Sequence, residues 1–247
     1  MKALRKACFW SWLCLMPLSG WAETLRVVAD EWPPYSGAEL PERGLAMDVV
    51  SSVLERAGYG VETRILPWAR IMGETEAGEF EVVGTMFFNE ERAQQWQFSE
   101  PYYLTSVQLI QRTGAGHSFE DIDSLLPLRV AVGAGTYYDQ WLIEAEHPDR
   151  VGLKTTLQAL QMVAAGRVDV AIVSVPVAEY YIRTSAPQLA DQLEFAPGVL
   201  GLHGIRMAVR RSLERSDDIV LSFNETLAAM RADGSLTSVL DRHLNQQ

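Results

Sequence analysis

Residues 130–136 read Val130-Ala131-Val132-Gly133-Ala134-Gly135-Thr136, a short apolar run followed at once by a glycine-rich turn. Valine-rich runs are typical of buried strands, and closely spaced glycines mark tight turns. Downstream, apolar residues recur at helical spacing over residues 138–145 and again over 157–163. Residues 168–173, Val-Asp-Val-Ala-Ile-Val, return to a strand pattern. This succession of strand, helices and strand is typical of a parallel sheet covered by helices.

The same pattern occurs earlier in the chain. Residues 25–29 and 61–66 have the composition of strands, and residues 45–57 carry apolar side chains at helical spacing between them. A helix over about 68–77 and a strand over 80–84 follow. The sequence therefore predicts two α/β units, each with its own core.

Two extended stretches, residues 103–112 and 204–209, join these units. We expect the chain to leave the first lobe near Gln111, to build the second lobe, and to return near His203. Two crossings form a hinge that can open and close around a ligand. Two further helices are expected, over residues 217–231 and 235–244. The predicted lobes comprise residues 23–111 with 204–247, and residues 112–203.

Residues 1–22 have the three-part pattern of a secretory signal peptide. A positively charged head (Lys2 to Lys6) precedes an apolar run over residues 7–18, and Gly20 and Ala22 supply small residues at the spacing of a cleavage site. The apolar run is shorter than the roughly 20 residues of a membrane-spanning helix. We therefore expect cleavage after Ala22 and a secreted mature chain.

Removing this leader changes the composition. Both cysteines, Cys8 and Cys14, lie within it, so the mature chain has no thiolate for a disulfide or a metal. The leader also holds three positive charges and no negative ones, and its loss takes the formal net charge from −11 to −14. Such a surface repels phosphate backbones, and we expect no nucleic-acid partner. The four histidines show no metal-binding spacing, so we expect neither a metal nor a cofactor.

Six short stretches point to a known family by their type and order. They are Leu25 to Tyr35, Gly44 to Val49, Pro67-Trp68, Asn89 to Ala93 with Phe98 to Tyr103, Val130 to Thr136, and Ala165 to Asp169. Together they resemble the periplasmic substrate-binding proteins of polar amino acid uptake, the family 3 solute-binding proteins, over essentially the whole mature chain. The resemblance implies a periplasmic-binding-protein fold of type II. In this α/β fold, each of two lobes has a mostly parallel sheet flanked by helices, and two crossings form the hinge.

The resemblance also implies a function and a location. We expect a periplasmic, monomeric receptor that closes over a small carboxylate-bearing ligand and passes it to an inner-membrane transporter or a sensor.

Five residues match ligand-binding positions of this family. Arg92 matches the arginine that grips the ligand carboxylate, and a guanidinium fork fits a carboxylate in two parallel hydrogen bonds. Trp32 and Trp68 match aromatic walls of the cleft. Thr85 matches a polar residue beside the arginine, and Thr136 opens a helix whose backbone N–H groups suit an anion.

Three positions depart from the family pattern. Phe87 stands where relatives carry a second hydroxyl residue, and Tyr137 stands where they often carry another threonine. Ser174 stands where an acidic residue usually binds the ligand's α-ammonium, and a serine supplies no countercharge. The ligand therefore either lacks a free α-amino group or finds its countercharge elsewhere. The candidates for that charge are Asp30, Glu31 and Glu179.

Two other functions remain open at this stage. Some relatives are enzymes that dehydrate cyclic dienyl acids, so a lyase of the cyclohexadienyl dehydratase type is an alternative. The chain shows no nucleophile elbow and no phosphate-binding loop, and we expect no catalysis. A protein-interaction module would suit the acidic surface but would leave a cleft arginine between two tryptophans unexplained.

Overall fold

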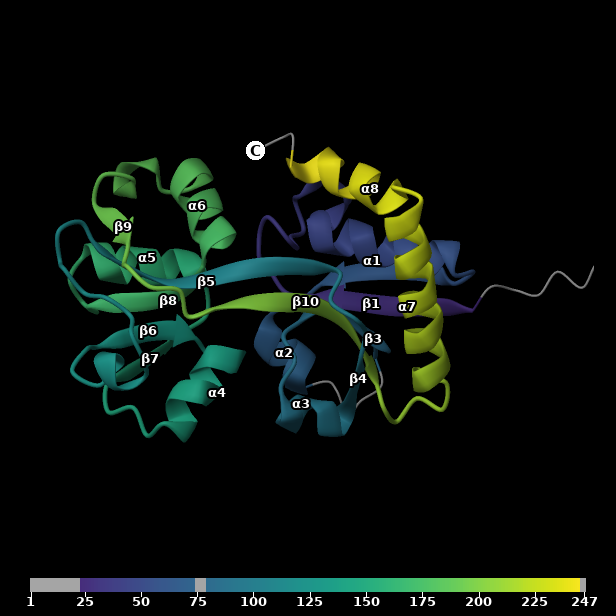
Figure 1. The fold of residues 1–247 in the computed structure, drawn as a ribbon, viewed down its shortest axis with the longest axis horizontal. Helices are drawn as coiled ribbons and strands as arrows, with labels where there is room; N and C mark the ends of the chain where they lie inside the picture. Colours follow the sequence, from purple (N-terminus) through teal and green to yellow (C-terminus); the bar gives the residue numbers. More distant parts are fainter. Residues whose placement is uncertain (1–22, 74–78, 245–247) are drawn as a thin grey trace, which may run out of the picture.

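The computed structural model describes residues 23–73 and 79–244, which form two lobes joined by a pair of long strands (Figure 1). The expected signal peptide, residues 1–22, and its cleavage after Ala22 lie outside the described residues. No helix in the described ranges combines the length and the apolar character needed to cross a membrane.

The first lobe is built on three parallel strands. Residues Thr24–Ala29 pair in parallel with Gly60–Ile65 on one side and, over Val27 and Val28, with the strand at Val82 and Val83 on the other. Its elements, in chain order, are β1 (Thr24–Ala29), α1 (Leu45–Arg56), β2 (Gly60–Ile65), α2 (Trp68–Gly73), β3 (Val82–Met86), α3 (Glu90–Gln95) and β4 (Trp96–Phe98), followed late in the chain by α7 (Ser216–Ala232) and α8 (Ser235–Leu244).

The second lobe repeats this plan. Its elements are β6 (Val130–Gly133), α4 (Tyr137–Glu144), β7 (Arg150–Leu153), α5 (Thr156–Ala164), β8 (Val170–Ser174), α6 (Val175–Thr184) and β9 (Leu193–Phe195). Strand β6 runs parallel to both β7 and β8. Short 3-10 turns occur at Pro41–Arg43, Asp123–Leu125 and Pro187–Leu189.

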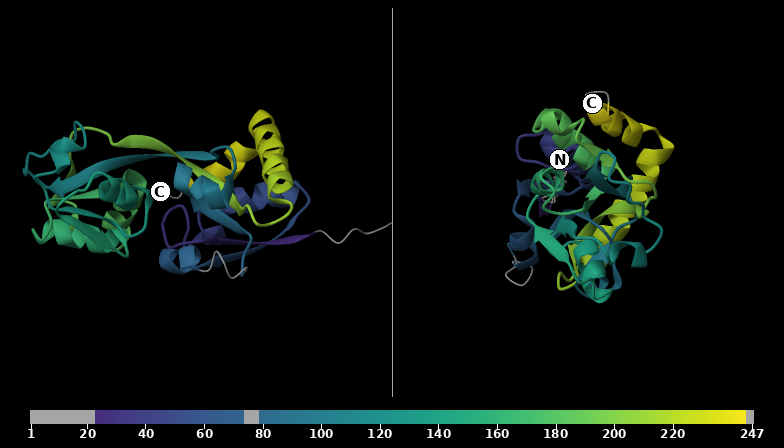
Figure 2. Two further views of the ribbon diagram at one scale, coloured as in Figure 1. Left: turned by 90° about the horizontal axis from the view of Figure 1, so that it is seen from below. Right: turned by 90° about the vertical axis from the view of Figure 1, so that its left-hand side faces the viewer.

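Two antiparallel strands, β5 (Tyr103–Arg112) and β10 (Gly201–Arg210), connect the lobes. They pair with each other over Tyr103–Val107 and Gly201–Ile205. Beyond this paired segment β5 joins β8 and β9, while β10 joins β3 and β4, so the sheet order is β2-β1-β3-β10-β5-β8-β6-β7. Figure 2 shows the two strands along one side of an elongated molecule. The lobe boundaries predicted from the sequence stay a prediction. Each of these two strands extends through both lobes, so neither strand marks a single point at which one lobe ends.

Each lobe buries its own apolar cluster. The first is centred on β1, α1 and α7 and includes Val27, Val50 and Phe223, all fully buried. The second lobe packs Leu160 and Leu142 on opposite faces of its sheet. Apolar side chains also join the two lobes: Val177, on α6 of the second lobe, packs in the first-lobe cluster, and Tyr181 of the same helix packs against it.

The predicted elements agree with the observed ones at most positions. The stretch 103–112 forms β5, and the helix expected over 217–231 is α7 at Ser216–Ala232. The helix α6 was missed, because valines on both sides of Pro176 resemble the continuation of the preceding strand. Pro176 stands in the first turn of α6, where its missing N–H costs no helical hydrogen bond.

Replacing Phe223 by alanine should lower the free energy of unfolding by about 3–5 kcal/mol, because a fully buried aromatic ring leaves a cavity. Leu221→Ala on the same helix is the matched control. Leu221 is 58% exposed, and its truncation should change stability by less than about 0.5 kcal/mol. Denaturant titrations of the two variants give the comparison, and equal losses would contradict this account of the core.

Candidate functional site

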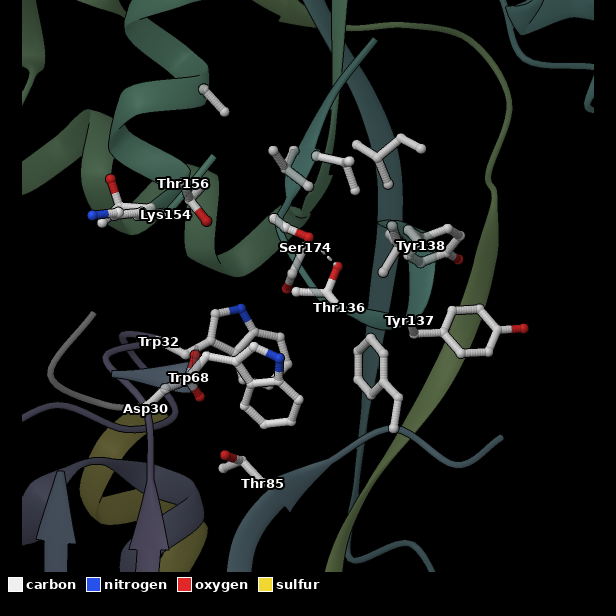
Figure 3. Close-up of a pocket in the computed structure, with 18 of the residues that line it drawn as sticks. Asp30, Trp32, Trp68, Thr85, Thr136, Tyr137, Tyr138, Lys154, Thr156 and Ser174 are labelled. Carbon is white, nitrogen blue, oxygen red and sulfur yellow. Dashed lines mark hydrogen bonds between the residues drawn. The ribbon is translucent and has the colours of Figure 1, made fainter. Parts of the chain in front are cut away.

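A cavity of about 150 Å³ lies between the lobes. Proteins hold benzene-sized molecules in cavities of about this volume. All eight residues singled out from the sequence line it. Figure 3 labels Trp32, Trp68, Thr85, Thr136, Tyr137 and Ser174 among them. The first lobe contributes Trp32, Trp68, Thr85, Phe87 and Arg92, and the second lobe contributes Thr136, Tyr137 and Ser174.

Arg92 is buried in the first-lobe side of the cavity, with 9% of its surface exposed. It stands on α3, where the side chain of Asn89 caps the helix by accepting a hydrogen bond from the Arg92 N–H (2.7 Å). Its guanidinium donates to the carbonyl oxygens of Phe87 and Gly135, each at 3.2 Å. Among the described residues no carboxylate lies within ion-pairing distance of it. Burial lowers the pKa of Arg92, although the guanidinium stays charged at every physiological pH.

The carbonyl of Gly135 links the two lobes. It belongs to the turn before α4 in the second lobe and accepts from Trp68 Nε1 (3.0 Å) as well as from Arg92, both of the first lobe. The Arg92 guanidinium carbon also lies 5.2 Å from the centre of the Trp68 ring, within cation–π distance. The turn is held in place because the Gly135 N–H donates to Asp139 (2.6 Å).

Thr85 presents a buried hydroxyl to the cavity. The residue is 4% exposed on β3, and its Oγ1 has no hydrogen-bond partner in the structure. An unsatisfied buried hydroxyl costs free energy, and most such groups in folded proteins find a partner. The Thr85 hydroxyl therefore has hydrogen-bonding capacity that a polar atom of a bound molecule could use.

Ser174 ends a chain of three buried hydroxyl groups. Tyr35 donates to Thr105 Oγ1 (2.8 Å), which lies 2.8 Å from Ser174 Oγ. Burial raises the pKa of Tyr35 to about 12, so its phenol keeps its proton at neutral pH. The chain runs from the first lobe through the connecting strand β5 to the second lobe.

Aromatic rings form one wall of the cavity. The Phe87 ring stacks on His203 (5.0 Å between ring centres) and meets Trp32 edge-on (5.6 Å). Tyr137 lies 6.4 Å from the Phe87 ring. Burial lowers the pKa of His203, whose ring also hydrogen-bonds the Tyr138 hydroxyl. At the position where relatives carry a hydroxyl, Phe87 therefore helps to make this side of the site apolar.

Several cavity residues were not predicted. Lys154, the only lysine beyond the leader, lies exposed at the rim beside Thr156 (Figure 3). No sequence pattern predicted that Lys154 lies at the cavity. The available signals were that no other lysine follows the leader and that Lys154 comes just before Thr155, the N-cap of α5. Asp30, a candidate for the countercharge, lines the opposite side (Figure 3), and Glu31 is also among the lining residues. Burial raises the pKa of Asp30 from 3.8 to about 6. Glu179, the third candidate, is not among the lining residues.

Comparison of the sequence with protein-family models gives one match. Residues 25–246 match the model of the bacterial extracellular solute-binding proteins, family 3. Among curated proteins the chain is similar to the L-cystine-binding protein TcyJ of Escherichia coli, with 22% identity over 85% of this chain and 78% of the relative.

Solved structures confirm the predicted two-lobe α/β fold. A histidine kinase sensor domain with similarity to periplasmic binding proteins superposes with a TM-score of 0.80 at 24% identity, covering 90% of this chain and 96% of the other. An ancestral arginine-binding protein bound to glutamine gives a TM-score of 0.74 at 22% identity, covering 91% and 99%.

The pKa of Asp30 predicts a pH effect on stability. Because the folded-state pKa of Asp30 lies above its ordinary value of 3.8, folding favours the protonated form. The free energy of unfolding should therefore fall as pH rises from about 4 to about 6, by about 1–3 kcal/mol. The Asp30→Asn variant should lack this loss, so its stability relative to wild type should increase over the same interval. Denaturant titrations of both proteins at pH 4 and pH 7 measure the difference, and a constant difference would refute the assignment.

Proposed function

Because the chain belongs to the bacterial extracellular solute-binding proteins of family 3, we propose that its cleft captures a small solute that bears a carboxylate, an amino acid or a related compound. The ligand would reach a membrane transporter or a sensor unchanged. The leader-like residues 1–22 support a periplasmic location for the mature protein.

The observation that carries this proposal is that Arg92 and Thr85 are both buried and line one cavity. Among the residues that the structure describes, the guanidinium has only carbonyl acceptors and the Thr85 hydroxyl has no hydrogen-bond partner. A carboxylate oxygen would satisfy both groups with charge-assisted hydrogen bonds. The eight residues predicted from the sequence would then surround the ligand, with Trp32, Trp68, Phe87 and Tyr137 excluding water from it.

Closure would follow from contacts that span the cleft. The Gly135 carbonyl already bridges the lobes through Trp68 and Arg92, and a ligand held by Arg92 and Thr136 would add bonds available only when the lobes meet. A ligand stabilises the closed form by the difference in its contacts with the two forms. The paired strands β5 and β10 are the candidate hinge.

The relatives support the ligand class and both routes of delivery. TcyJ is named for binding L-cystine, and the ancestral protein holds glutamine. The sensor domain shows that the same fold also serves in a histidine kinase. We propose no catalytic role. An enzyme on this scaffold would need a general acid or base in the cavity, and Asp30 and Lys154 are the lining residues that could serve. Mass spectrometry of the ligand recovered after long incubation tests this alternative.

Replacing Arg92 by alanine should weaken binding of any carboxylate found in a thermal-shift screen by about 100-fold, because the ligand loses its charged partner in a buried site. Isothermal titration calorimetry measures the effect. Arg183→Ala removes an exposed arginine on α6 outside the cavity and should leave affinity unchanged. Undiminished binding by Arg92→Ala would rule out this function for the cleft, as would a screen in which no carboxylate binds.

Thr85→Val should act in opposite directions on stability and on binding. Removing a buried hydroxyl that has no partner should leave the unliganded protein as stable as wild type or more stable. The same change should weaken carboxylate binding by about tenfold, since the ligand loses one hydrogen bond. Melting curves with and without ligand test both effects, and an unchanged affinity would exclude Thr85 from the site.

A further inference from the structure

The wall that the second lobe turns toward the cavity carries no carboxylate among the described residues that line it. Its only charged member is Lys154, and its polar members are hydroxyl groups. Members of the resembled family usually place an acidic residue on this wall to bind an α-ammonium. In this chain Ser174 occupies that position.

Three helices of the second lobe begin at this wall. The N-cap residues Thr136 of α4, Thr155 of α5 and Ser174 of α6 all line the cavity. Neither Thr136 nor Ser174 caps its helix with its side chain, and Thr136 instead donates to the carbonyl of Gly133 (2.7 Å). At α5 the Thr155 side chain caps the helix by accepting from the Gln158 N–H (3.2 Å), so the starts without a side-chain cap are those of α4 and α6. The N–H groups and the dipole at a helix start favour a negative charge, so the wall suits anions.

The hydroxyl chain allows Ser174 to act as a donor toward the cavity. Tyr35 donates to Thr105, and Thr105 Oγ1 lies 2.8 Å from Ser174 Oγ, where either hydroxyl can be the donor. When Thr105 donates, Ser174 keeps its own proton for a group in the cavity. A hydroxyl that donates suits a carboxylate or carbonyl oxygen and does not offset the charge of an ammonium.

The first lobe offers a separate anion site across the cavity. Arg92 and the unpartnered hydroxyl of Thr85 stand there, and Figure 3 shows Thr85 and Lys154 on opposite sides of the space between the lobes. The acids on this side are Asp30 and Glu31. Glu31 accepts from the Ala38 N–H (3.2 Å), and Asp30 lies close enough to Arg92 for their charges to act on each other, so neither acid is reserved for a ligand ammonium.

We infer that the ligand is a small dicarboxylate without a free α-ammonium. One carboxylate would bind Arg92 and Thr85, and the other would face Ser174, Lys154 and the three helix starts. This inference rests on the proposed function, because it assumes that Arg92 holds a ligand carboxylate.

The test compares glutarate with L-glutamate, which differ only by the α-amino group. Calorimetric titration of the full mature chain should show glutarate binding at least tenfold more tightly. Ser174→Asp restores an acid at the usual position and should reverse this preference. Lys154→Gln should weaken glutarate binding by about fivefold, a modest effect because the lysine is exposed at the rim. Lys154→Arg keeps the charge and should retain the wild-type affinity within about twofold.

The outcomes separate the inference from the proposed function. If L-glutamate or another amino acid binds more tightly than glutarate, the inference is wrong, while a carboxylate receptor dependent on Arg92 remains. If neither member of the pair binds and another carboxylate does, the inference also fails. If no carboxylate binds at all, the proposed function fails with it. If Ser174→Asp does not fold, the two Lys154 variants and the glutarate–glutamate pair decide the question.

Discussion

The constraint on which the rest of this site depends is a buried guanidinium, that of Arg92, with no carboxylate within ion-pairing distance among residues 23–73 and 79–244. Moving a charged group from water into a protein costs several kcal/mol unless hydrogen bonds and opposite charge offset the loss. In this structure Arg92 has two carbonyl oxygens and the face of Trp68 as its compensation. These contacts satisfy part of the guanidinium, and the charges of Glu91 and Asp30 act on it only from beyond ion-pairing distance. An anionic ligand would offset the remaining charge. This would explain why α3 places Arg92 at the cavity and why aromatic and hydroxyl side chains surround it.

The carbonyl of Gly135 couples this arginine to the arrangement of the lobes. Since Arg92 and Trp68 both donate to it across the cleft, the unliganded protein already has contacts that favour closure. A ligand carboxylate would compete with this carbonyl for Arg92 while leaving the Trp68 bond in place. On the proposed function, a ligand carboxylate would replace the Gly135 carbonyl as an acceptor of Arg92, and the cost of that exchange would reduce the affinity that its other bonds supply.

The sequence predicted the fold well wherever periodicity or family motifs were strong. The connecting strands, both parallel units and the two terminal helices lie where the pattern placed them, and the eight candidate residues meet in one cavity. Their contact with a ligand stays a prediction. Other features could not be read from the sequence. The hydroxyl chain joins Thr105 to Ser174 across 69 residues, and only the folded sheet brings them together. Lys154 follows no pattern that distinguishes a cleft residue from any exposed lysine.

The route of the chain between the lobes has a consequence for how the protein folds. Every strand pairing within the second lobe, apart from those of β5, joins residues between 130 and 174. In the first lobe, β3 pairs with β10, and residues 82 and 83 lie opposite 209 and 208. The pairing of β3 with β10 therefore cannot form until a segment more than 100 residues further along the chain has been synthesised. Because contacts distant in sequence form slowly, the second lobe has the topology of an early folding unit, and an incomplete chain exposes the edge of β3. On this topology, the lobe whose synthesis begins first would be the last to be completed.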